Sequence, residues 1–596
     1  MQHYRFECGC SFPVLKESND SDILPLLDFD VDNINLDCNA TWKLLGKGIT
    51  KGVFQLESQL GKQWTKKLKP EHIEHLAALG ALLRPGCLRA IDERHQCSMT
   101  ELYCRRKNGD APVEYIHDSL RLILEPTFGV LTYQEQAMEI ARILAGFTLQ
   151  EADELRKAIG KKLAEEMAKV KIKFMEGARR LQIASEEQAV EIFGWIEKSQ
   201  RYSFNKSHAV SYGINGYISA FLKTHFPVYF YTSWLFYAKD KQDPQQEIKE
   251  LVNDAKLMDV QVLSPDICNG QKNFSTDGKI VTFGLSDVKG IGEAQVDKMT
   301  TAIQSVTQLL GKDIQMWTWY ELLVHLTPLL SNTVVTRLIS VGAMRAFSNQ
   351  RALMLAEYEK YNSLTKKEQE WIRIRSLNPY AKASYPIVKT IEASPNRQSI
   401  FDTEEENPFS WITNSKEEID FLGLPTFTNL VEALKAAAFV KSEGGAAANY
   451  RRKEVIESAA RLLENPITPY EDLPHEIAWN EENLLGIALS CNKVDGCDIS
   501  GANCTCKELL SGREGLCVVA VQVESVRTIT VKNGKQAGAK MAFLTVMDSS
   551  CAVEMIAFPD AWRSFSSLLS EGNTVTIQAR KDNKKDSIII DKVAQI

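Results

Sequence analysis

Hydrophobic and polar positions follow two different periods along this chain, and the change of period divides it. Between residues 45 and 240 apolar residues recur at three- and four-residue spacing, most clearly over 134–144 and 151–178, which predicts amphipathic helices. From Val260 to Gly284 the apolar runs shorten, and Asp277-Gly278 between apolar neighbours predicts a hairpin. After residue 516, runs rich in Val, Ile, Phe and Thr alternate with turn residues, which predicts a small barrel of about five strands.

The expected fold class is therefore multidomain α+β. We expect a short acidic lead-in, a mostly helical domain, a second helical region, a connector rich in Pro, Asn, Ser and acidic residues, and a β-barrel; the ranges are 1–44, 45–240, 241–375, 376–480 and 481–596. An OB-fold is the natural candidate for the barrel because its open face binds single strands. A small sandwich is the alternative.

Composition narrows the function classes. With 44% hydrophobic and 25% charged residues in 596 positions, the chain is ordinary globular protein. A formal charge of −7 excludes a general basic coat, so any nucleic-acid site must be local. Thirteen irregularly spaced cysteines and the lack of a secretory leader indicate a reducing cytoplasm.

Several common activities lack their motifs here. The most membrane-like stretch, 217–238, is interrupted by Lys223, His225 and Pro227, so it reads as a buried aromatic helix pair and no membrane association is expected. The chain contains no G-x-x-x-x-G-K-[ST], no H-E-x-x-H and no G-x-S-x-G. An ATP-driven motor, a zinc protease of that type and a serine hydrolase are therefore disfavoured.

The strongest local concentration of positive charge lies between Arg156 and Lys173. Seven cations oppose only Glu165 and Glu166, a surplus of five; the cations are Arg156, Lys157, Lys161, Lys162, Lys169, Lys171 and Lys173. On a helix, the early members project from neighbouring positions and could hold a triphosphate and a nucleic-acid backbone. A solvated charged face is the alternative.

A second cluster gathers chemistry suited to phosphate and sugar contacts. Residues 200–208 place cations, an amide, hydroxyls and an imidazole between aromatic rings, and the members of interest are Asn205, Lys206, Ser207 and His208. Asn and Ser also cap helices, and a helix from Ala209 could require such a cap.

A short glycine turn follows at Lys289-Gly290-Ile291-Gly292. This pattern at the start of a helix is the signature of a helix-hairpin-helix, whose backbone N–H groups can hold one DNA phosphate. Glycine pairs that merely end helices are the alternative.

The cysteines offer a weaker hypothesis. Cys491, Cys497, Cys504 and Cys506 could supply four thiolates, but their spacing does not match the C-x-x-C pairs of zinc sites. Unpaired thiols are the alternative, and the same holds for Cys8 and Cys10.

Taken together, these segments resemble the bacterial replicative DNA polymerase III alpha subunit, of the C-family of polymerases, in that family's own order. The segments that resemble its fingers domain are Gly52-Val53-Phe54-Gln55-Leu56-Glu57-Ser58, Leu83-Arg84-Pro85-Gly86, Glu125-Pro126-Thr127-Phe128-Gly129-Val130, Tyr133-Gln134-Glu135-Gln136, 152–162 and Phe204-Asn205-Lys206-Ser207-His208. Val288 to Gly292 and Leu338-Ile339-x-x-Gly342-Ala343 resemble its tandem helix-hairpin-helix region. Residues 484–490 and 526–559 resemble the approach to its OB domain and the domain itself.

This resemblance implies a role for each cluster. Arg156, Lys157 and the 205–208 loop are expected to contact the phosphates of an incoming dNTP and the primer-template. DNA contacts are expected at Lys161, Lys162, Lys289, Gly290 and Gly292. The family usually carries two arginines where this chain has Arg156-Lys157, and lysine supplies a point charge without the bidentate fork.

The resemblance also implies parts that this sequence lacks. The family begins with a PHP domain and a palm whose three aspartates hold two divalent ions, and this chain starts beyond that palm. We therefore expect no catalytic or metal-binding residue in this chain, with Mg²⁺ bound mainly by a companion chain that carries the PHP domain and palm. Asp28, Asp30 and Asp32 are a less favoured alternative, because they lie where the family has a linker.

The family also carries a clamp-binding peptide. Gln398, Ile400 and Phe401 in Gln398-Ser399-Ile400-Phe401 are a plausible version that would dock on a sliding clamp. Short patterns of this kind also match by chance. The further partners expected are DNA primer-template, dNTPs and the companion chain, in the cytoplasm of a host if the protein comes from a phage.

The leading hypothesis is therefore one part of a split replicative DNA polymerase, a nucleotidyltransferase active with its companion. The alternative is a non-catalytic DNA-binding replication accessory derived from that polymerase, which intact Arg156 and His208 disfavour. A fragment of one long polymerase is biochemically close to the first hypothesis.

Overall fold

The computed structural model describes most of the chain. The described residues are 2–5, 11–14, 34–92, 94–161, 164–199, 203–377, 427–442, 447–513, 515–532, 534–582 and 587–596. The chain divides into two compact units, Met1–Trp234 and Leu235–Ile596. Each unit is described by itself.

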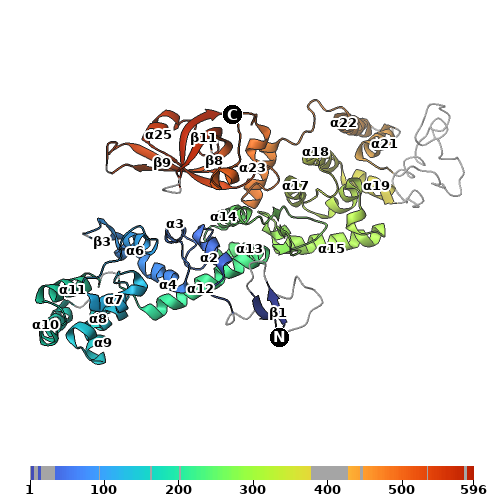
Figure 1. Ribbon diagram of the computed structural model, residues 1–596. Helices are drawn as coiled ribbons and strands as arrows, with labels where there is room; N and C mark the ends of the chain where they lie inside the picture. Colours follow the sequence, from blue (N-terminus) through green and yellow to red (C-terminus); the bar gives the residue numbers. More distant parts are fainter. Residues whose placement is uncertain are drawn as a thin grey trace, which may run out of the picture. The chain divides into compact units, whose positions relative to one another are not determined.

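The first unit is built around one long helix, α12 (Lys206–His225), which packs along α4 (Ile73–Leu82) (Figure 1). A Cβ on Gly213 would lie 3.2 Å from the backbone nitrogen of Ala77, so glycine is what lets the two helices approach. Shorter helices surround this pair: α2 (Asn39–Gly46), α3 (Gln59–Leu68), α5 (Pro85–Arg89) and α6 (Met99–Lys107). Two small antiparallel pairs complete it: β1 (Gln2–Arg5) with β2 (Ser11–Val14), and β3 (Ile91–Asp92) with β4 (Cys97–Ser98).

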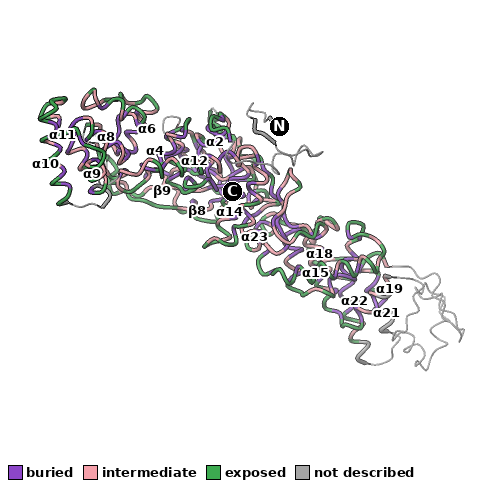
Figure 2. Tube along the Cα trace, turned by 90° about the horizontal axis from the view of Figure 1, so that it is seen from below, coloured by how far each residue is buried: buried purple, intermediate pink, exposed green. Residues whose placement is uncertain are grey.

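A bundle of helices forms the other part of this unit. Its members are α7 (Arg121–Leu124), α8 (Gln134–Ala145), α9 (Leu149–Lys161), α10 (Ala164–Leu181) and α11 (Glu186–Ser199). Their apolar stripes close on a core that includes Leu155, Phe174 and Phe193, and Figure 2 colours the outer turns of α10 and α11 as exposed. The three- and four-residue spacing therefore predicted these helices correctly.

The aromatic stretch after Tyr217 forms two helices, as expected. Pro227 begins α13 (Pro227–Phe236) directly after α12. Tyr217, Phe221 and Tyr231 are each at most 1% exposed. In the described part of the chain, every helix is too short or too polar to cross a membrane.

The second unit begins with α14 (Pro244–Leu257) and a three-stranded sheet in the order β5 (Val262–Leu263), β7 (Val281–Thr282), β6 (Ser275–Thr276). Thr276 pairs with Val281 in antiparallel register, and Gly278 has a φ of +92°. The Asp277 carboxylate accepts the N–H groups of Lys279 and Ile280. The predicted Asp277-Gly278 hairpin is confirmed.

A helical region follows the sheet. Its helices are α15 (Glu293–Leu310), α16 (Trp319–Glu321), a π-helix over Leu322–Leu326, α17 (Asn332–Ser340), α18 (Arg351–Asn362), α19 (Lys366–Leu377), α21 (Leu430–Ser442), α22 (Ala447–Glu464) and α23 (Pro474–Leu485). The expected connector, 376–480, thus holds more helix than its composition indicated. Alanine has the highest helix propensity, and Ala447 and Ala448 begin α22.

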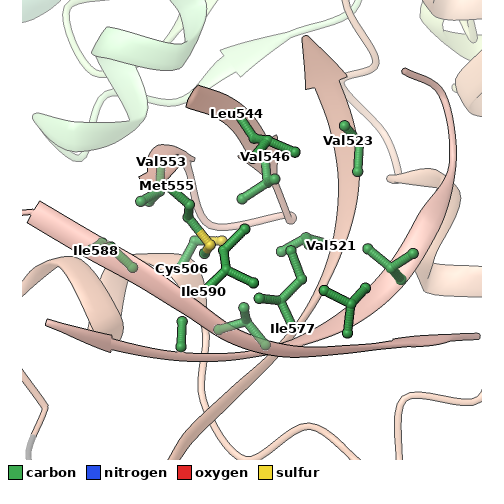
Figure 3. Packing of buried hydrophobic residues seen from close by; sticks show 14 of the residues in the cluster. Cys506, Val521, Val523, Leu544, Val546, Val553, Met555, Ile577, Ile588 and Ile590 are labelled. Carbon is green, nitrogen blue, oxygen red and sulfur yellow. The ribbon is translucent and has the colours of Figure 1, made fainter. Parts of the chain in front are cut away.

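The C-terminal region forms a closed barrel of five strands. They are β8 (Cys517–Thr530), β9 (Lys540–Met547), β10 (Ala552–Ala557), β11 (Thr574–Asp582) and β12 (Ser587–Gln595), joined in the cyclic order β8, β9, β10, β12, β11. The β10–β12 pair is parallel, and α25 (Pro559–Phe565) lies between β10 and β11 in the chain. Alternate residues such as Val521, Leu544 and Ile577 fill the interior (Figure 3). This is an OB-like barrel, as predicted.

Candidate functional site

The predicted loop around Asn205 lies where two helices begin side by side. Phe204 forms a parallel bridge with Tyr133, its N–H donates to the Thr132 carbonyl at 3.1 Å, and its carbonyl accepts the Gln134 N–H at 2.9 Å. Asn205 then caps α12 by accepting the His208 N–H at 2.9 Å. The helix therefore begins at Lys206, three residues before the expected start.

Two carboxylates hold this loop. Glu135, at the start of α8, accepts Asn205 Nδ2 at 2.9 Å and the Lys206 N–H at 3.0 Å. Glu74, on α4, lies 3.4 Å from Lys206 Nζ. The loop is thus tied to two other helices, and Ser207 Oγ donates to Asn205 Oδ1 at 2.6 Å within it.

An aromatic row runs from this loop along α12. We use this name for Phe204, His208, Tyr212 and Phe54, whose successive ring centroids lie 5.3, 4.1 and 5.2 Å apart. The Arg84 guanidinium lies 3.5 Å from the centroid of the Phe204 ring. Phe54 and Tyr212 are each 38% exposed, so the row presents ring surface to solvent.

Sequence reasoning missed several of these residues. Glu135 and Phe54 belong to segments that resemble the fingers domain, but the sequence predicts no role for them. It does not indicate Glu74 or Tyr212 as site residues. The four-residue spacing of His208 and Tyr212 is the signal that could have found part of the row, because residues four apart share one helix face.

Arg156 and Lys157 both lie on α9 and both pair with Asp153. Arg156 Nε and Lys157 Nζ are each 2.8 Å from a carboxylate oxygen of Asp153. Hydrogen bonds from Lys157 and Arg156 lower the pKa of Asp153. Within the described part of the chain, no hydrogen bond or ion pair joins these two cations to the 205–208 loop.

The positive surplus around α9 and α10 is smaller than the local count indicated. Lys173 pairs with Glu151 at 2.8 Å and Lys171 with Glu197 at 3.1 Å, and Asp153 serves Arg156 and Lys157. These three acids lie outside the window that was counted. Lys162 and the side chain of Lys161 lie outside the described residues.

The glycine turn begins α15, as the helix-hairpin-helix pattern predicts. Gly290 is exposed with a φ of +79°, while Val288 and Ile291 are buried. The Lys289 N–H donates to the Leu484 carbonyl at 2.8 Å, and the Gly292 N–H donates to Gln295 Oε1 at 2.9 Å. The Ile291 N–H donates to the Val288 carbonyl at 2.9 Å, so three of the turn's four N–H groups are already engaged.

The barrel exposes a polar and aromatic edge on β8 and β9. Arg527 lies opposite Phe543 in the register, with its guanidinium 5.1 Å from the ring centroid. Ile529 is 41% exposed. OB-folds that bind single strands combine cations with aromatic rings; here Arg527 is exposed and Phe543 is half-buried.

The four C-terminal cysteines make separate contacts. Cys491 Sγ donates to the Pro474 carbonyl and Cys504 Sγ to the Val518 carbonyl, while Cys506 is fully buried. Burial raises the pKa of the Cys491 thiol to about 11. Among the described residues no three His, Cys, Asp or Glu side chains form a group that could hold a metal ion.

Some predicted positions cannot be compared with the structure. Cys8, Cys10, Asp28, Asp30 and Asp32 lie outside the described residues, as do Gln398, Ile400 and Phe401.

Comparison with known proteins gives two matches to defined sequence families. Residues 14–182 match the bacterial DNA polymerase III alpha subunit finger domain, and residues 259–354 match a helix-hairpin-helix motif. The first range contains α9 with Arg156 and Lys157, and the second contains the glycine turn before α15; the 205–208 loop and the barrel lie outside both. The class indicated is a polymerase fingers domain followed by a helix-hairpin-helix region.

The relatives share one description. DNA polymerase III subunit alpha of Aquifex aeolicus is 40% identical over 286 residues, which cover 48% of this chain and 24% of that protein. The Thermus aquaticus subunit is 34% identical over 374 residues, 62% of this chain and 29% of the relative, and that of Escherichia coli K12 is 35% identical over 334 residues, 55% and 27%. The matches thus span about a quarter of each relative's length. Residues 14–182 and 259–354 of this chain are therefore similar to the finger domain of bacterial DNA polymerase III alpha subunits and to a helix-hairpin-helix motif.

Proposed function

We propose that this chain supplies the nucleotide- and template-gripping part of a replicative DNA polymerase. It acts with a companion chain that carries the PHP domain and the palm with the catalytic aspartates. Support comes from the fingers and hairpin matches. The observation that carries the proposal is the fixed 205–208 loop at the start of α12, with an exposed aromatic row beside it.

The start of α12 is suited to an anionic ligand. A helix N-terminus carries partial positive charge, and the side chains of Lys206 and His208 lie on its first turn; the His208 N–H is already bound by Asn205, so these side chains are the proposed contacts. Glu135 already engages the backbone N–H of Lys206. The loop is therefore held in place before any ligand arrives, which lowers the entropic cost of binding.

Arg156 and Lys157 are the proposed second contact to the triphosphate. In the chain without ligand, both side chains form ion pairs with Asp153. Exposed ion pairs of this kind contribute little to stability, so a triphosphate can displace the carboxylate at little cost. Asp153 keeps the two side chains close together until then.

The aromatic row is the proposed stacking surface for bases. Base–aromatic stacking contributes about 1–3 kcal/mol per base and is independent of sequence. His208 and Tyr212 lie in the first and second turns of α12. A nucleotide whose phosphates lie at the loop can therefore rest its base on these rings.

Catalysis needs divalent ions that the companion would hold. Two-metal nucleotidyl transfer requires carboxylates that bind Mg²⁺ and stabilise the attacking and leaving oxygens. The described acidic residues of this chain form no such group. The proposed roles of this chain are to bind and orient nucleotide and primer-template, and the hairpin and barrel regions extend the grip along DNA.

Primer extension with the two chains separate and mixed tests the proposal. The lone chain should bind primer-template with a strong salt dependence and incorporate no nucleotide, while mixing with a companion bearing PHP and palm should give Mg²⁺-dependent synthesis. Synthesis by the lone chain would contradict the split-polymerase proposal.

A double variant then tests the triphosphate contact. Replacing Arg156 and Lys157 with Ala in the mixed enzyme should raise KM for dNTP or lower kcat/KM. The matched control replaces Lys169 and Lys171 on α10, which are also exposed and ion-paired, and should leave dNTP kinetics unchanged. Equal kinetics for both double variants would remove Arg156 and Lys157 from the site.

A further inference from the structure

The helix-hairpin-helix region contains two glycine turns, and an arginine lies against each of them. At the first turn, a Cβ added to Gly290 would lie 1.5 Å from Arg337 Nη1. At the second turn, after α17, a Cβ added to Gly342 would lie 2.5 Å from Arg351 Nη2. Both glycines have positive φ, +79° and +73°. The two turns therefore share one local design, a left-handed glycine with a guanidinium in the space a side chain would fill.

The two arginines differ in their partners. Arg351 donates to the Ser340 carbonyl at 3.0 Å, to Glu481 at 2.8 Å and to Ser490 Oγ at 2.6 Å. The Arg337 guanidinium is half-buried and has no hydrogen-bond or ion-pair partner in the part of the chain that the structure describes. A half-buried guanidinium without a hydrogen-bond acceptor costs folding free energy. An acceptor from outside the chain would remove this cost for Arg337.

The backbone N–H groups of the two turns also differ in whether they have a partner within the chain. The Gly342 N–H donates to the Ile339 carbonyl and the Ala343 N–H to the Leu338 carbonyl. The Gly290 N–H makes no hydrogen bond with any described residue. The first turn thus presents a free N–H and a free guanidinium together, whereas the second turn presents neither.

The charges around the first turn favour an anion. Lys289 is exposed and lacks an acidic partner among the described residues. The nearest acids along α15, Glu293 and Asp297, are both engaged by Lys272, at 3.2 and 3.1 Å. Neither carboxylate is therefore left uncompensated next to an approaching phosphate.

We infer that Arg337 binds a backbone phosphate of duplex DNA at the first turn. The second turn has the same backbone shape but binds no phosphate, because Arg351 is hydrogen-bonded within the chain. This inference rests on the proposed function, since the match to a helix-hairpin-helix motif is what gives the ligand its class. Arginine presents two parallel N–H donors to a phosphate. A contact to the backbone carries no sequence information, so the binding is independent of sequence.

Duplex binding by full-length variants tests the assignment. Fluorescence anisotropy would measure Kd for two blunt duplexes of unrelated sequence at several salt concentrations. Arg337→Met keeps the apolar stem and removes the charge; it should weaken both duplexes equally and reduce the slope of log Kd against log salt by about 0.9. Arg337→Lys should restore the slope.

Two controls separate this contact from general effects. Arg461→Met removes an exposed arginine at the end of α22 and should leave the slope unchanged. Arg351→Met should lower the melting temperature, whereas Arg337→Met should not, because Arg337 has no described partner to lose. If the parent chain binds duplex normally and Arg337→Met has the same slope of log Kd against log salt, the inference is wrong and the proposed function is unaffected. Failure of the parent chain to bind duplex would overturn both the inference and the proposed function.

Discussion

Glu481 is a buried carboxylate whose removal should disturb several elements of the second unit. It is fully buried on α23, and its carboxylate accepts Arg351 at 2.8 Å and the N–H groups of Leu489 and Ser490 at 2.6 and 2.8 Å. Arg351 begins α18, so this single carboxylate joins α18, α23 and the segment that leads to the barrel.

The expected cost of Glu481→Gln follows from these contacts. The substitution preserves the volume, removes the charge and leaves the Arg351 guanidinium, 14% exposed at its side chain, without its counter-ion. Breaking one partner of a buried pair costs about 3–5 kcal/mol, a large fraction of the 5–15 kcal/mol that typically stabilises a domain. A neutral amide oxygen also accepts more weakly than a carboxylate.

Amide hydrogen exchange is the suitable assay, because a chain with several domains has no single free energy of unfolding. Exchange at α23 and at the start of α18 should speed up by about two to nearly four orders of magnitude in Glu481→Gln. The control is Glu482→Gln, whose partly exposed pair with Lys493 should be worth about 0–1 kcal/mol. The double variant Glu481→Leu with Arg351→Met should recover only the part of the loss that comes from the unpaired guanidinium, because the N–H groups of Leu489 and Ser490 still lose their acceptor.

A change of less than tenfold in Glu481→Gln would refute the reasoning. It would mean that the carboxylate is not the counter-ion on which Arg351 depends. Equal effects of the two glutamine variants would refute it as well, because burial would then have no influence.

Two further changes have predictable results. Tyr212→Ala removes one ring of the aromatic row and should weaken binding of primer-template by about 1–3 kcal/mol, roughly 5- to 150-fold. Two controls should bind normally: Tyr212→Phe, which keeps the ring, and Tyr237→Ala, which removes an exposed ring outside the row. Equal affinity for all three variants would exclude base stacking on Tyr212. Burial raises the pKa of Asp287 to about 6, so the folded state holds this proton more strongly than the unfolded chain and stability falls as pH rises from about 4 to 6. Asp287→Asn removes the titration, and its melting temperature should exceed that of the parent by a margin that grows between pH 4 and pH 7, corresponding to at most about 3 kcal/mol. A margin independent of pH would contradict the assigned cause.

Local signals predicted the elements whose causes are local. The Asp277-Gly278 turn needs only a left-handed glycine and an aspartate that accepts the next N–H groups, so it is readable from a few residues. The barrel strands follow from alternate burial. The helix α22 was not predicted, because the glycines beside the alanine run indicated a flexible connector. The high helix propensity of alanine itself favours the helix that forms.

The site was predictable only in part, because its electrostatics depend on distant partners. The motif identified Asn205, yet its anchor Glu135 lies 70 residues away in the chain. The charge count around Lys171 missed Glu197, 26 residues further on. A window along the sequence records which cations are present, but only the fold determines which of them remain uncompensated.

That distinction connects the composition to the proposed function. A chain with seven more acids than bases cannot attract DNA through its overall charge, so binding must depend on cations that the fold leaves without acids. Arg337 beside Gly290 and Arg84 over Phe204 are two such groups among the described residues, and they lie on the hairpin region and beside the aromatic row. Arg156 and Lys157 belong to a different class, since their shared carboxylate must be displaced first. The unpaired groups are therefore suited to holding DNA continuously, and the paired groups to a ligand that arrives and leaves in each catalytic cycle.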